Sequence, residues 1–343
     1  MLLAVAFEFP TLSGGERSML AVLSRPPAEG WDVVALAPPD GPLADELRVA
    51  GVRVEPFDLR ASGNKPPPEW AAEMLGEAVD RCGADLVHAN SLSMSRVAGR
   101  WSATTGRTAT GHVRDMMRLS QAAVRDVNAL AAVLCVSGAT RDYHLAQGLD
   151  AAVSRVVHNG VDVPAAGETI ERTGPPVIAT VGQVCLRKGH DVAAAALATM
   201  GNVDWRWWVV GERFSQKAES AAFDAALETT LGSLSDRLVR TGYRDDVWPV
   251  LRRADVLLHP ARQEPFGRVL LEASAVGTPI VACDVGGTRE MLGDTATLVP
   301  PDDPSALAAA VRAALAADRP EPVRRFTVDA CVSKTWDAWG AAV

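Results

Sequence analysis

Two glutamates, Glu264 and Glu272, stand with seven residues between them, and a turn of Pro265, Phe266 and Gly267 follows the first of them. A packed core does not require a carboxylate before such a turn and another in the segment that follows. The run DVLLHPA before the turn is typical of a buried strand, and RVLLEASAVG after it is typical of a helix. We therefore expect Glu264 in a loop at the carboxyl end of a strand. Beside it, a helix that begins near Phe266 would present free N–H groups.

These features suit a ligand with phosphate in its middle and hydroxyl groups at both ends. The N–H groups of a helix N-terminus bind phosphate. Carboxylates only accept hydrogen bonds, so they suit the hydroxyl groups of sugars. Nucleotide sugars have this layout. The structural alternative is that Glu264 is a capping carboxylate and that Glu272 lies on a solvated helix face.

Two further candidates lie in the first half of the chain. Gly14 and Gly15, in LSGGERSML, follow the first predicted strand and open a helix, where glycine lets backbone approach a phosphate closely. His112 ends the predicted strand TATGHV. The structural alternatives are a simple turn for the glycine pair and a histidine satisfied within the core for His112.

The elements that must position these residues alternate between short apolar runs and Ala/Leu-rich segments, which indicates repeated strand–helix units. Strands are predicted at 2–9, 31–38, 52–57, 84–90, 108–113, 132–137 and 154–160, and then at 176–182, 204–211, 237–243, 255–261, 278–284 and 296–301. Helices are predicted at 191–200, 221–231, 245–254, 268–277 and 305–317. This pattern favours two doubly wound parallel sheets.

A polar segment with proline and glycine, residues 161–176, separates the two sets of strands. We predict an N-terminal domain at 1–163, a C-terminal domain at 164–325, and a last helix at 326–343 that crosses back onto the first domain. Because open α/β sheets bind ligands at the carboxyl ends of their strands, the two domains should face each other across a crevice that holds the motifs.

Composition excludes several classes of protein. The net charge of −8 and pI near 5.3 argue against a nucleic-acid partner, which needs a basic face. No run of about 18 apolar residues could span a bilayer. Five scattered cysteines without CxxC spacing indicate reduced thiols and a cytoplasmic location. Six arginines in residues 94–125 fit either a solvated helical face or attraction to an anionic acceptor or a membrane surface, and membrane association is not favoured.

A resemblance to a known family adds to this interpretation. The segments EPFGRVLLEA and GTPIVACDVGGTREML resemble the E-x7-E signature of the family-four retaining glycosyltransferases with the GT-B fold. VIATVGQVCLRKGHD, WWVVGE and TATLVPPDDPSALAAAV occur in the family's order, and VVHNGVD resembles the end of its first domain. The resemblance implies two Rossmann-like domains that face a deep cleft, with the acceptor bound by the first domain and the nucleotide-sugar donor by the second.

The resemblance also implies roles for single residues. Glu264 would contact hydroxyls of the donor sugar, and Glu272 would contact the ribose of the nucleoside. Gly14 and Gly15 would lie near the donor phosphates and the acceptor. His112 would lie near the anomeric carbon or a sugar hydroxyl. His112 and Glu264, together with Lys188, are therefore the predicted catalytic residues.

The predicted diphosphate site departs from the family in one position. Family members place an arginine five residues before the lysine that corresponds to Lys188, and the two clamp the diphosphate. Gln183 occupies that position here. Arg268, in the first turn of the predicted helix, could supply the missing charge. We expect the donor-binding set to comprise Gly14, Gly15, Gln183, Lys188, Glu264, Pro265, Phe266, Gly267, Arg268 and Glu272.

The predicted activity is a metal-independent, retaining transfer of a hexose-type sugar from a UDP- or GDP-sugar to a hydroxyl of a small-molecule or glycan acceptor. Natural-product and cell-envelope glycan biosynthesis are the settings considered, and no cofactor or metal is expected. Two alternatives remain at this stage. A nucleotide-sugar epimerase of the same fold would form product without an acceptor. A non-catalytic nucleotide-sugar binder would bind donor without turnover, and Gln183 motivates that alternative.

Overall fold

The computed structural model describes residues 1–343 except 166–169, 202–203 and 214–217. The chain divides into two compact units. Unit 1 comprises Met1–Gly160 with Phe326–Val343, and unit 2 comprises Val161–Arg325. The first division therefore follows residue 160, where the sequence placed it after 163, and the second falls at the predicted boundary between 325 and 326. Residues 166–169 of the predicted seam lie outside the described residues.

Unit 1 is built on a seven-stranded parallel sheet with the strand order β3-β2-β1-β4-β5-β6-β7. Its strands are β1 (Leu2–Ala6), β2 (Asp32–Ala37), β3 (Arg53–Pro56), β4 (Leu86–Ala89), β5 (Ala109–Val113), β6 (Ala132–Cys135) and β7 (Ser154–Val156). Its helices are α1 (Gly14–Leu23), α2 (Pro42–Val49), α3 (Pro68–Cys82), α4 (Leu92–Thr105), α5 (Gln121–Asn128), α6 (Gly138–Leu145) and α13 (Val328–Gly340).

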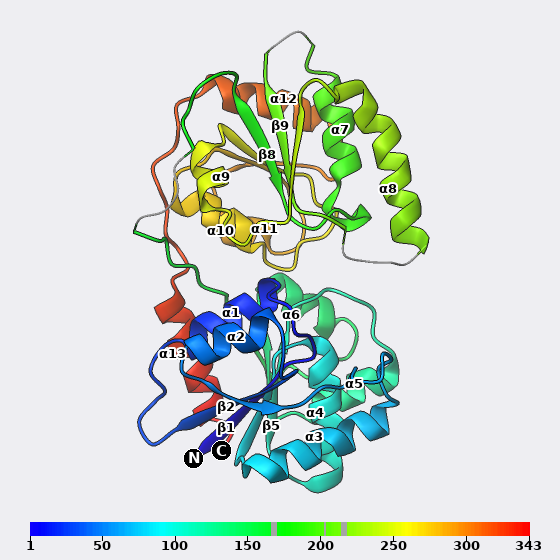
Figure 1. Cartoon of the computed structure of the whole chain (residues 1–343), viewed down its shortest axis with the longest axis vertical. Helices are drawn as coiled ribbons and strands as arrows, with labels where there is room; N and C mark the ends of the chain where they lie inside the picture. The colour runs from blue at the N-terminus through cyan, green and yellow to red at the C-terminus, as the bar shows by residue number, and fades with distance from the viewer. Residues whose placement is uncertain (166–169, 202–203, 214–217) are drawn as a thin grey trace. The chain divides into compact units, whose positions relative to one another are not determined.

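Side chains on the two faces of this sheet enter separate cores, because successive residues of a strand point to opposite faces. In β1, Ala4 packs on one face with α3 and α4, whereas Leu3 and Val5 pack on the other with α1, α2 and α13. Figure 1 shows the same two layers, with the red α13 beside the blue α1. The C-terminal helix thus completes the core of unit 1, as predicted.

Unit 2 is built on a six-stranded parallel sheet with the order β10-β9-β8-β11-β12-β13. Its strands are β8 (Val177–Val181), β9 (Arg206–Val210), β10 (Leu238–Gly242), β11 (Val256–His259), β12 (Ile280–Cys283) and β13 (Thr297–Val299). Its helices are α7 (His190–Ala198), α8 (Ala218–Leu231), α9 (Trp248–Arg253), α10 (Arg268–Ala275), α11 (Thr288–Leu292) and α12 (Pro304–Ala316), with the 3-10 turns η1 (Leu186–Lys188) and η2 (Gly232–Leu234).

The core of unit 2 contains two fully buried tryptophans of the DWRWWVV run, Trp205 and Trp207. The indole N–H of Trp207 donates to Thr180 Oγ1 at 2.9 Å, so the polar atom of this large side chain is satisfied within the core. Helices α7, α8 and α12 pack on this core. In Figure 1, α9, α10 and α11 lie on the other side of the sheet.

The prediction of two doubly wound parallel sheets is confirmed, and each predicted strand coincides with an observed one. Element ends differ from the predicted ones by a few residues. At the candidate site, α10 begins at Arg268, with Gly267 as its N-cap, rather than near Phe266. Both sheets reverse their strand order at one point, between β1 and β4 in unit 1 and between β8 and β11 in unit 2. Ligands of open α/β sheets bind at such switch points, beside the carboxyl ends of the strands.

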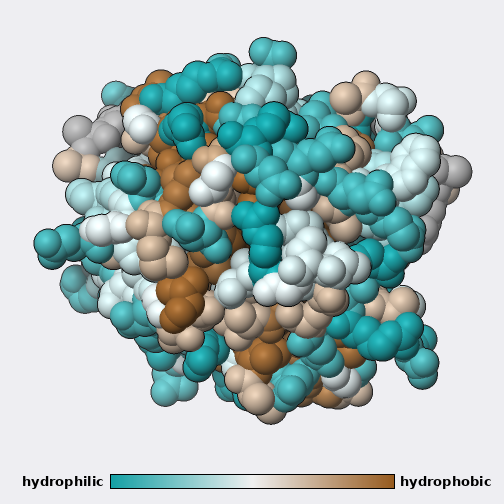
Figure 2. All heavy atoms as spheres, turned by 90° about the horizontal axis from the view of Figure 1, so that it is seen from below, coloured by the Kyte–Doolittle hydropathy of each residue, from teal (hydrophilic) through white to brown (hydrophobic). Residues whose placement is uncertain are grey.

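The surface is mixed in character. On the face shown in Figure 2, hydrophilic residues cover most of the area, and hydrophobic residues gather in a band and a smaller group between them. Among the residues that the structure describes, no helix combines the length and the apolar character that a membrane crossing requires. The large hydrophobic side chains that are exposed come from separate parts of the chain: Met1, Phe9, Val49, Trp70, Met117, Leu186, Val239, Tyr243 and Val343.

Trp339 on α13 tests the contribution of the returning helix to unit 1. Its side chain is 0% exposed and lies edge-on to His88, with ring centroids 5.1 Å apart. Trp339→Ala should lower the free energy of unfolding of unit 1 by about 3–5 kcal/mol, because a large cavity would remain in the core. Urea denaturation followed by circular dichroism measures this change. The matched control is Trp70→Ala, since Trp70 is 64% exposed. Equal stability of the two variants would contradict the proposed role of α13.

Candidate active site

The loops after β8 and β11 are joined at the switch point of unit 2. The two strands pair directly, with Ile178 opposite Val256. Arg262 N–H donates to Arg187 O at 2.9 Å, which links the two loops through their backbones. Gly189, at φ +69°, lies so close to Pro260 that a Cβ would stand 1.9 Å from its carbonyl oxygen. Glycine is therefore required where the loops meet.

This junction brings Lys188 of the first loop against Glu264 of the second. Lys188 Nζ donates to Glu264 Oε2 at 2.6 Å, and the Nε2 of His259, at the end of β11, lies 2.8 Å from the same oxygen. Glu264 is buried, with 4% of its surface exposed. Two of the three predicted catalytic residues therefore lie in direct contact, and the sequence did not predict the third partner, His259.

The contacts determine the ionisation of Glu264. Burial by itself raises the pKa of a carboxyl group. The charge of Lys188 and the hydrogen bond from His259 outweigh this effect and hold the pKa of Glu264 well below its usual range. Glu264 is therefore an anion. An anionic carboxylate only accepts hydrogen bonds, so His259 donates from Nε2.

The histidines around the pair are neutral. Burial, the largest cause, lowers the pKa of His259, and the charge of Lys188 adds to this effect, while Glu264 opposes it. His190, the first residue of α7, is buried too, and burial together with Lys188 lowers its pKa to about 4. The histidines therefore add no charge to the Lys188–Glu264 pair.

The second oxygen of Glu264 has a different environment. Both donors contact Oε2, and within the described part of the chain no hydrogen-bond donor contacts Oε1. Oε1 is also absent from the enclosed polar atoms that lack a partner. One oxygen thus fixes the carboxylate, and the other remains available to a ligand.

The turn and helix after Glu264 form the rest of the predicted donor set. Pro265 and Phe266 are buried, and Gly267 is the N-cap of α10. Arg268 Nη2 contacts Glu272 Oε1 at 3.0 Å, one helical turn apart. The structure therefore pairs the predicted phosphate ligand Arg268 with the predicted ribose ligand Glu272, a contact that the sequence analysis did not include. Gln183 lies half-buried in the loop after β8, which also carries Lys188.

Gly14 and Gly15 begin α1 at the switch point of unit 1. Asn90, which follows β4, donates from Nδ2 to Gly15 O at 3.3 Å. A Cβ on Gly15 would lie 2.9 Å from Cδ of Arg114. Arg114 in turn donates from Nη1 to Asn159 Oδ1 at 2.8 Å. Glycine at position 15 therefore admits the arginine side chain, a reason that differs from the predicted approach of a phosphate.

His112 is enclosed beside this arginine. It is 2% exposed, and its Nδ1 lies 3.2 Å from both Arg114 Nη2 and His88 Nε2. Because guanidinium only donates, Nδ1 is the acceptor and the proton is on Nε2. Burial and the charge of Arg114 lower the pKa of His112 well below its usual range. Nε2 is buried and has no partner among the described residues.

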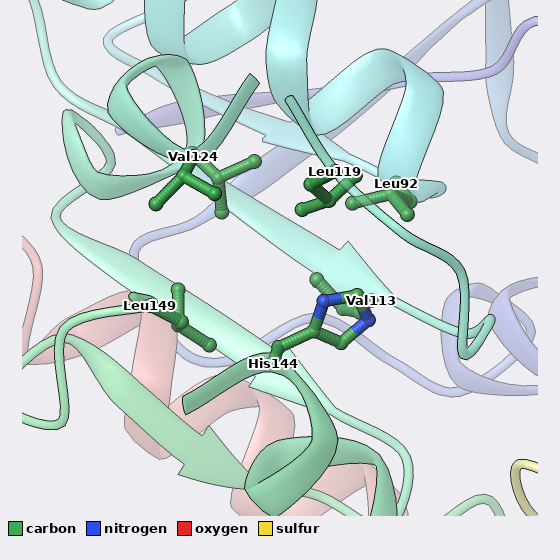
Figure 3. Close-up of a pocket in the computed structure, with 7 residues that line it drawn as sticks. Leu92, Val113, Leu119, Val124, His144 and Leu149 are labelled. Carbon is green, nitrogen blue, oxygen red and sulfur yellow. The ribbon is translucent and has the colours of Figure 1, made fainter. Parts of the chain in front are cut away.

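Two hollows in unit 1 contain none of the predicted site residues. The smaller is an apolar cavity of about 10 Å³, shown in Figure 3, on which His144 and apolar side chains of several elements converge. A cavity of this size holds at most one water molecule. The larger is a surface groove of about 720 Å³ lined by α3 and α4, including Glu73 and Trp101, and by Arg107, which follows α4.

Three residues that lie near the predicted ones were not predicted from the sequence. His259, His190 and Arg114 each stand at the end of a strand or the start of a helix, which was the available signal. The sequence indicates a structural role for His259, because this residue lies within the predicted strand 255–261. Its partner is a carboxylate from the following loop, and only the fold of that loop brings the two together.

Two doubly wound parallel sheets with polar residues at both switch points define a ligand-binding protein of the Rossmann-like α/β class. The family model "Glycosyltransferase Family 4" matches residues 12–164, and the model "Glycosyl transferases group 1" matches residues 175–317. The chain belongs to the glycosyltransferase family that these two models describe. The resemblance inferred from the E-x7-E signature is confirmed.

Curated relatives match part of the chain. A glycogen synthase of Mycobacterium tuberculosis is 34% identical over 178 residues, which are 50% of this chain and 41% of that protein. A 2-deoxystreptamine glucosyltransferase of Streptomyces kanamyceticus is 34% identical over 160 residues, 45% of this chain and 39% of that protein. The matches thus span about two fifths of the length of these relatives.

A solved structure matches the whole fold. The structure of Anabaena HepE in complex with UDP-glucose superposes with a TM-score of 0.83 and covers 99% of this chain and 100% of that chain. The sequence identity is 22%, so the likeness shows a shared fold. The predicted GT-B fold class is confirmed.

Replacement of Glu264 tests the charge pair. Glu264→Gln should lower the free energy of unfolding by about 3 kcal/mol at neutral pH, because Lys188 would remain a largely buried cation without its carboxylate. Since the pKa of Glu264 is lowered on folding, this advantage of the wild type is complete above its usual value of 4.5 and decreases as the pH falls below it. Urea titrations across pH 3–8 would measure both effects.

A matched control is Glu321→Gln, which removes the same charge from an exposed position of unit 2. In addition, Lys188→Met should recover part of the lost stability in the Glu264→Gln background, because the unpaired cation is removed. A difference between wild type and Glu264→Gln that grows as the pH falls would contradict the ionisation assigned to Glu264.

Proposed function

We propose that the protein is a retaining glycosyltransferase that moves a sugar from a nucleoside-diphosphate sugar to a hydroxyl group of an acceptor. One observation carries the proposal: at the switch point of unit 2, an ionised Glu264 is fixed through one oxygen while its other oxygen remains available. The names of the relatives support it, since one is a glucosyltransferase and the other a synthase of a polysaccharide. HepE, whose structure was solved with UDP-glucose, supports a UDP-sugar as the donor to try first, ahead of a GDP-sugar.

In this proposal the donor is held along the loop from Glu264 to Glu272. The N–H groups at the start of α10 bind the diphosphate together with Lys188. Glu264 Oε1 accepts from hydroxyl groups of the sugar, and Glu272 accepts from the ribose. Pro265, Phe266 and Gly267 shape the turn between them.

Donor binding would change the partners of Lys188. In the structure, Lys188 contacts Glu264 Oε2. An arriving diphosphate would compete for the lysine, and His259 would keep the carboxylate in place through the same oxygen. Gln183 would supply hydrogen bonds alone, so most of the cationic stabilisation of the leaving diphosphate comes from Lys188, with Arg268 in support. Such charges act mainly on the transition state, in which the diphosphate gains negative charge.

The neutral state of His112 defines its proposed role. Its Nδ1 lone pair is occupied and its pKa is lowered, so it does not act as a general base. We assign it as a hydrogen-bond donor, through Nε2–H, to an oxygen of the sugar. The proton of the acceptor hydroxyl would then pass to the leaving phosphate on the same face of the sugar, which retains the anomeric configuration. Gly14 and Gly15 would border the acceptor.

The first test is donor turnover by Glu264→Gln. The kcat/KM should fall by about 100-fold or more, because a positioned polar contact in a closed site is lost. Steady-state kinetics with a panel of UDP- and GDP-sugars and polyol acceptors would measure it. A thermal-shift titration with donor should show that the variant still folds and binds. Unchanged turnover would remove the basis of the proposal, and donor binding without turnover in the wild type would favour a non-catalytic binder.

The second test concerns mechanism. With an α-linked donor and excess chelator, transfer should continue and NMR of the product should show an α-glycoside. The physical reason is that Lys188 and the start of α10 take the role that a divalent ion has in other transferases. A β-linked product would contradict retention, and loss of activity that added Mn²⁺ restores would contradict metal independence.

A further inference from the structure

A second buried glutamate, Glu8, lies at the switch point of unit 1. It follows β1, and the side chains around it come from the segments after β3 and β4. Arg60 donates from Nε and Nη2 to Glu8 Oε1 at 3.2 and 2.7 Å. Lys65 Nζ lies 3.5 Å from the same oxygen and donates to Ser93 Oγ in the first turn of α4. The strand order therefore brings these side chains to the edge at which open α/β sheets bind ligands.

The carboxylate lies beneath its cations. The side chain of Glu8 is 1% exposed, whereas those of Arg60 and Lys65 are 38% and 28% exposed. A molecule that approaches this edge from solvent would meet the guanidinium and ammonium groups and would not reach the carboxylate. The exposed chemistry of the cluster is therefore cationic.

The positive charge exceeds what Glu8 neutralises. Burial, the largest cause, lowers the pKa of Lys65, and Arg60 and Arg96 lower it further against the opposing effect of Glu8. Arg96 lies on α4 three residues after Ser93, the residue that accepts from Lys65, and side chains at this spacing lie on one face of a helix. Among the described residues, one other carboxylate contacts these three side chains' segment. It belongs to Asp58, which accepts from the backbone N–H of Arg60 at 2.7 Å. Three cations face two carboxylates, in a chain whose net charge is −8.

Two further features favour a negatively charged group at this place. Arg96 Nε is buried and has no acceptor within the described part of the chain. The start of α4 lies here as well, capped by Ser91, whose side chain accepts from Met94 N–H at 3.1 Å. The N-terminus of a helix of this length carries a partial positive charge.

We propose that Arg60, Lys65 and Arg96, named the cationic cluster, bind a phosphate group of the acceptor. The inference rests on the proposed function in one respect, namely that unit 1 holds the acceptor. Phe9 is exposed beside the cluster, and the guanidinium of Arg60 lies 4.9 Å from the centre of its ring. A ring of this kind offers a flat surface to the carbon skeleton of a sugar or cyclitol. The acceptor class is therefore a phosphorylated sugar or polyol.

Direct binding is the first arm of the test. Isothermal titration calorimetry with inorganic phosphate, in saturating UDP to occupy unit 2, would compare the wild type with Lys65→Ala and Arg96→Ala. Each variant should weaken phosphate binding by about 10-fold, because one charge-assisted hydrogen bond is lost. Lys334→Ala is the matched control, since Lys334 lies exposed on α13 of the same unit. Arg60 is not substituted, because it donates both hydrogen bonds at 3.2 and 2.7 Å to the buried Glu8, whereas Lys65 lies 3.5 Å from the carboxylate.

A further variant distinguishes the proposed phosphate site of unit 1 from the donor site of unit 2. Lys188→Ala should retain the phosphate binding that Lys65→Ala weakens, because Lys188 belongs to unit 2. Absence of phosphate binding in the wild type would overturn the inference. Binding that Lys65→Ala and Arg96→Ala leave unchanged would overturn it equally.

The second arm uses pairs of acceptors that differ by one phosphate, such as glucose and glucose 6-phosphate or myo-inositol and its monophosphate. With UDP-glucose as donor, the wild type should prefer the phosphorylated member, and Lys65→Ala should reduce the ratio of kcat/KM by about 10-fold. Vesicles with and without phosphatidylinositol would show whether the phosphate comes from a lipid or a free molecule. Transfer without any phosphate preference overturns the inference and leaves the proposed function intact. No transfer, with phosphate binding lost in Lys65→Ala, supports the cluster and refutes the proposed function.

Discussion

The ion pair between Lys188 and Glu264 is the interaction on which the site of unit 2 depends. It joins the loops after β8 and β11, two neighbouring strands between which the chain order of the sheet reverses. A buried carboxylate is stable as an anion only with a cation and hydrogen-bond donors close to it. Lys188 and His259 meet both needs through one oxygen of Glu264, so the same contacts that stabilise the charge also orient the second oxygen.

Both units stabilise a buried glutamate with nearby cations, but the net charge of the two groups differs. Each places a buried glutamate after a strand at its switch point, Glu264 in unit 2 and Glu8 in unit 1. Glu264 has one cationic partner and neutral imidazoles around it. Glu8 lies beneath two partly exposed cations, with Arg96 acting on Lys65 from α4. Unit 2 thus has an anionic oxygen available for hydroxyl groups, and unit 1 has surplus positive charge for an anion.

Buried neutral histidines are present in both units. His112 and His88 in unit 1, and His190 and His259 in unit 2, are all buried, and burial lowers their pKa values. A neutral imidazole provides one donor and one acceptor without adding charge. The Nε2–H of His259 donates to Glu264, and the Nδ1 of His112 accepts from Arg114. The histidines therefore orient charged side chains without adding to the net charge of the site.

The sequence by itself determined the strands, the domain pattern and the segment that carries Glu264 and Glu272, because buried parallel strands are continuous apolar runs with motifs directly after them. It also placed His112 at the end of a strand and Lys188 in the loop after another. The tertiary structure alone decided which of these side chains meet. Strand order brings β8 beside β11 and β1 beside β4, so Glu264 finds Lys188 across 76 positions of the chain and Arg60 finds Glu8 across 52. Such pairings between distant segments leave no periodic pattern in the sequence, which is why Arg114 and the cationic cluster emerged only once the chain was folded. His259 lies only five positions before Glu264, but the conformation of the intervening loop decides that the two side chains meet.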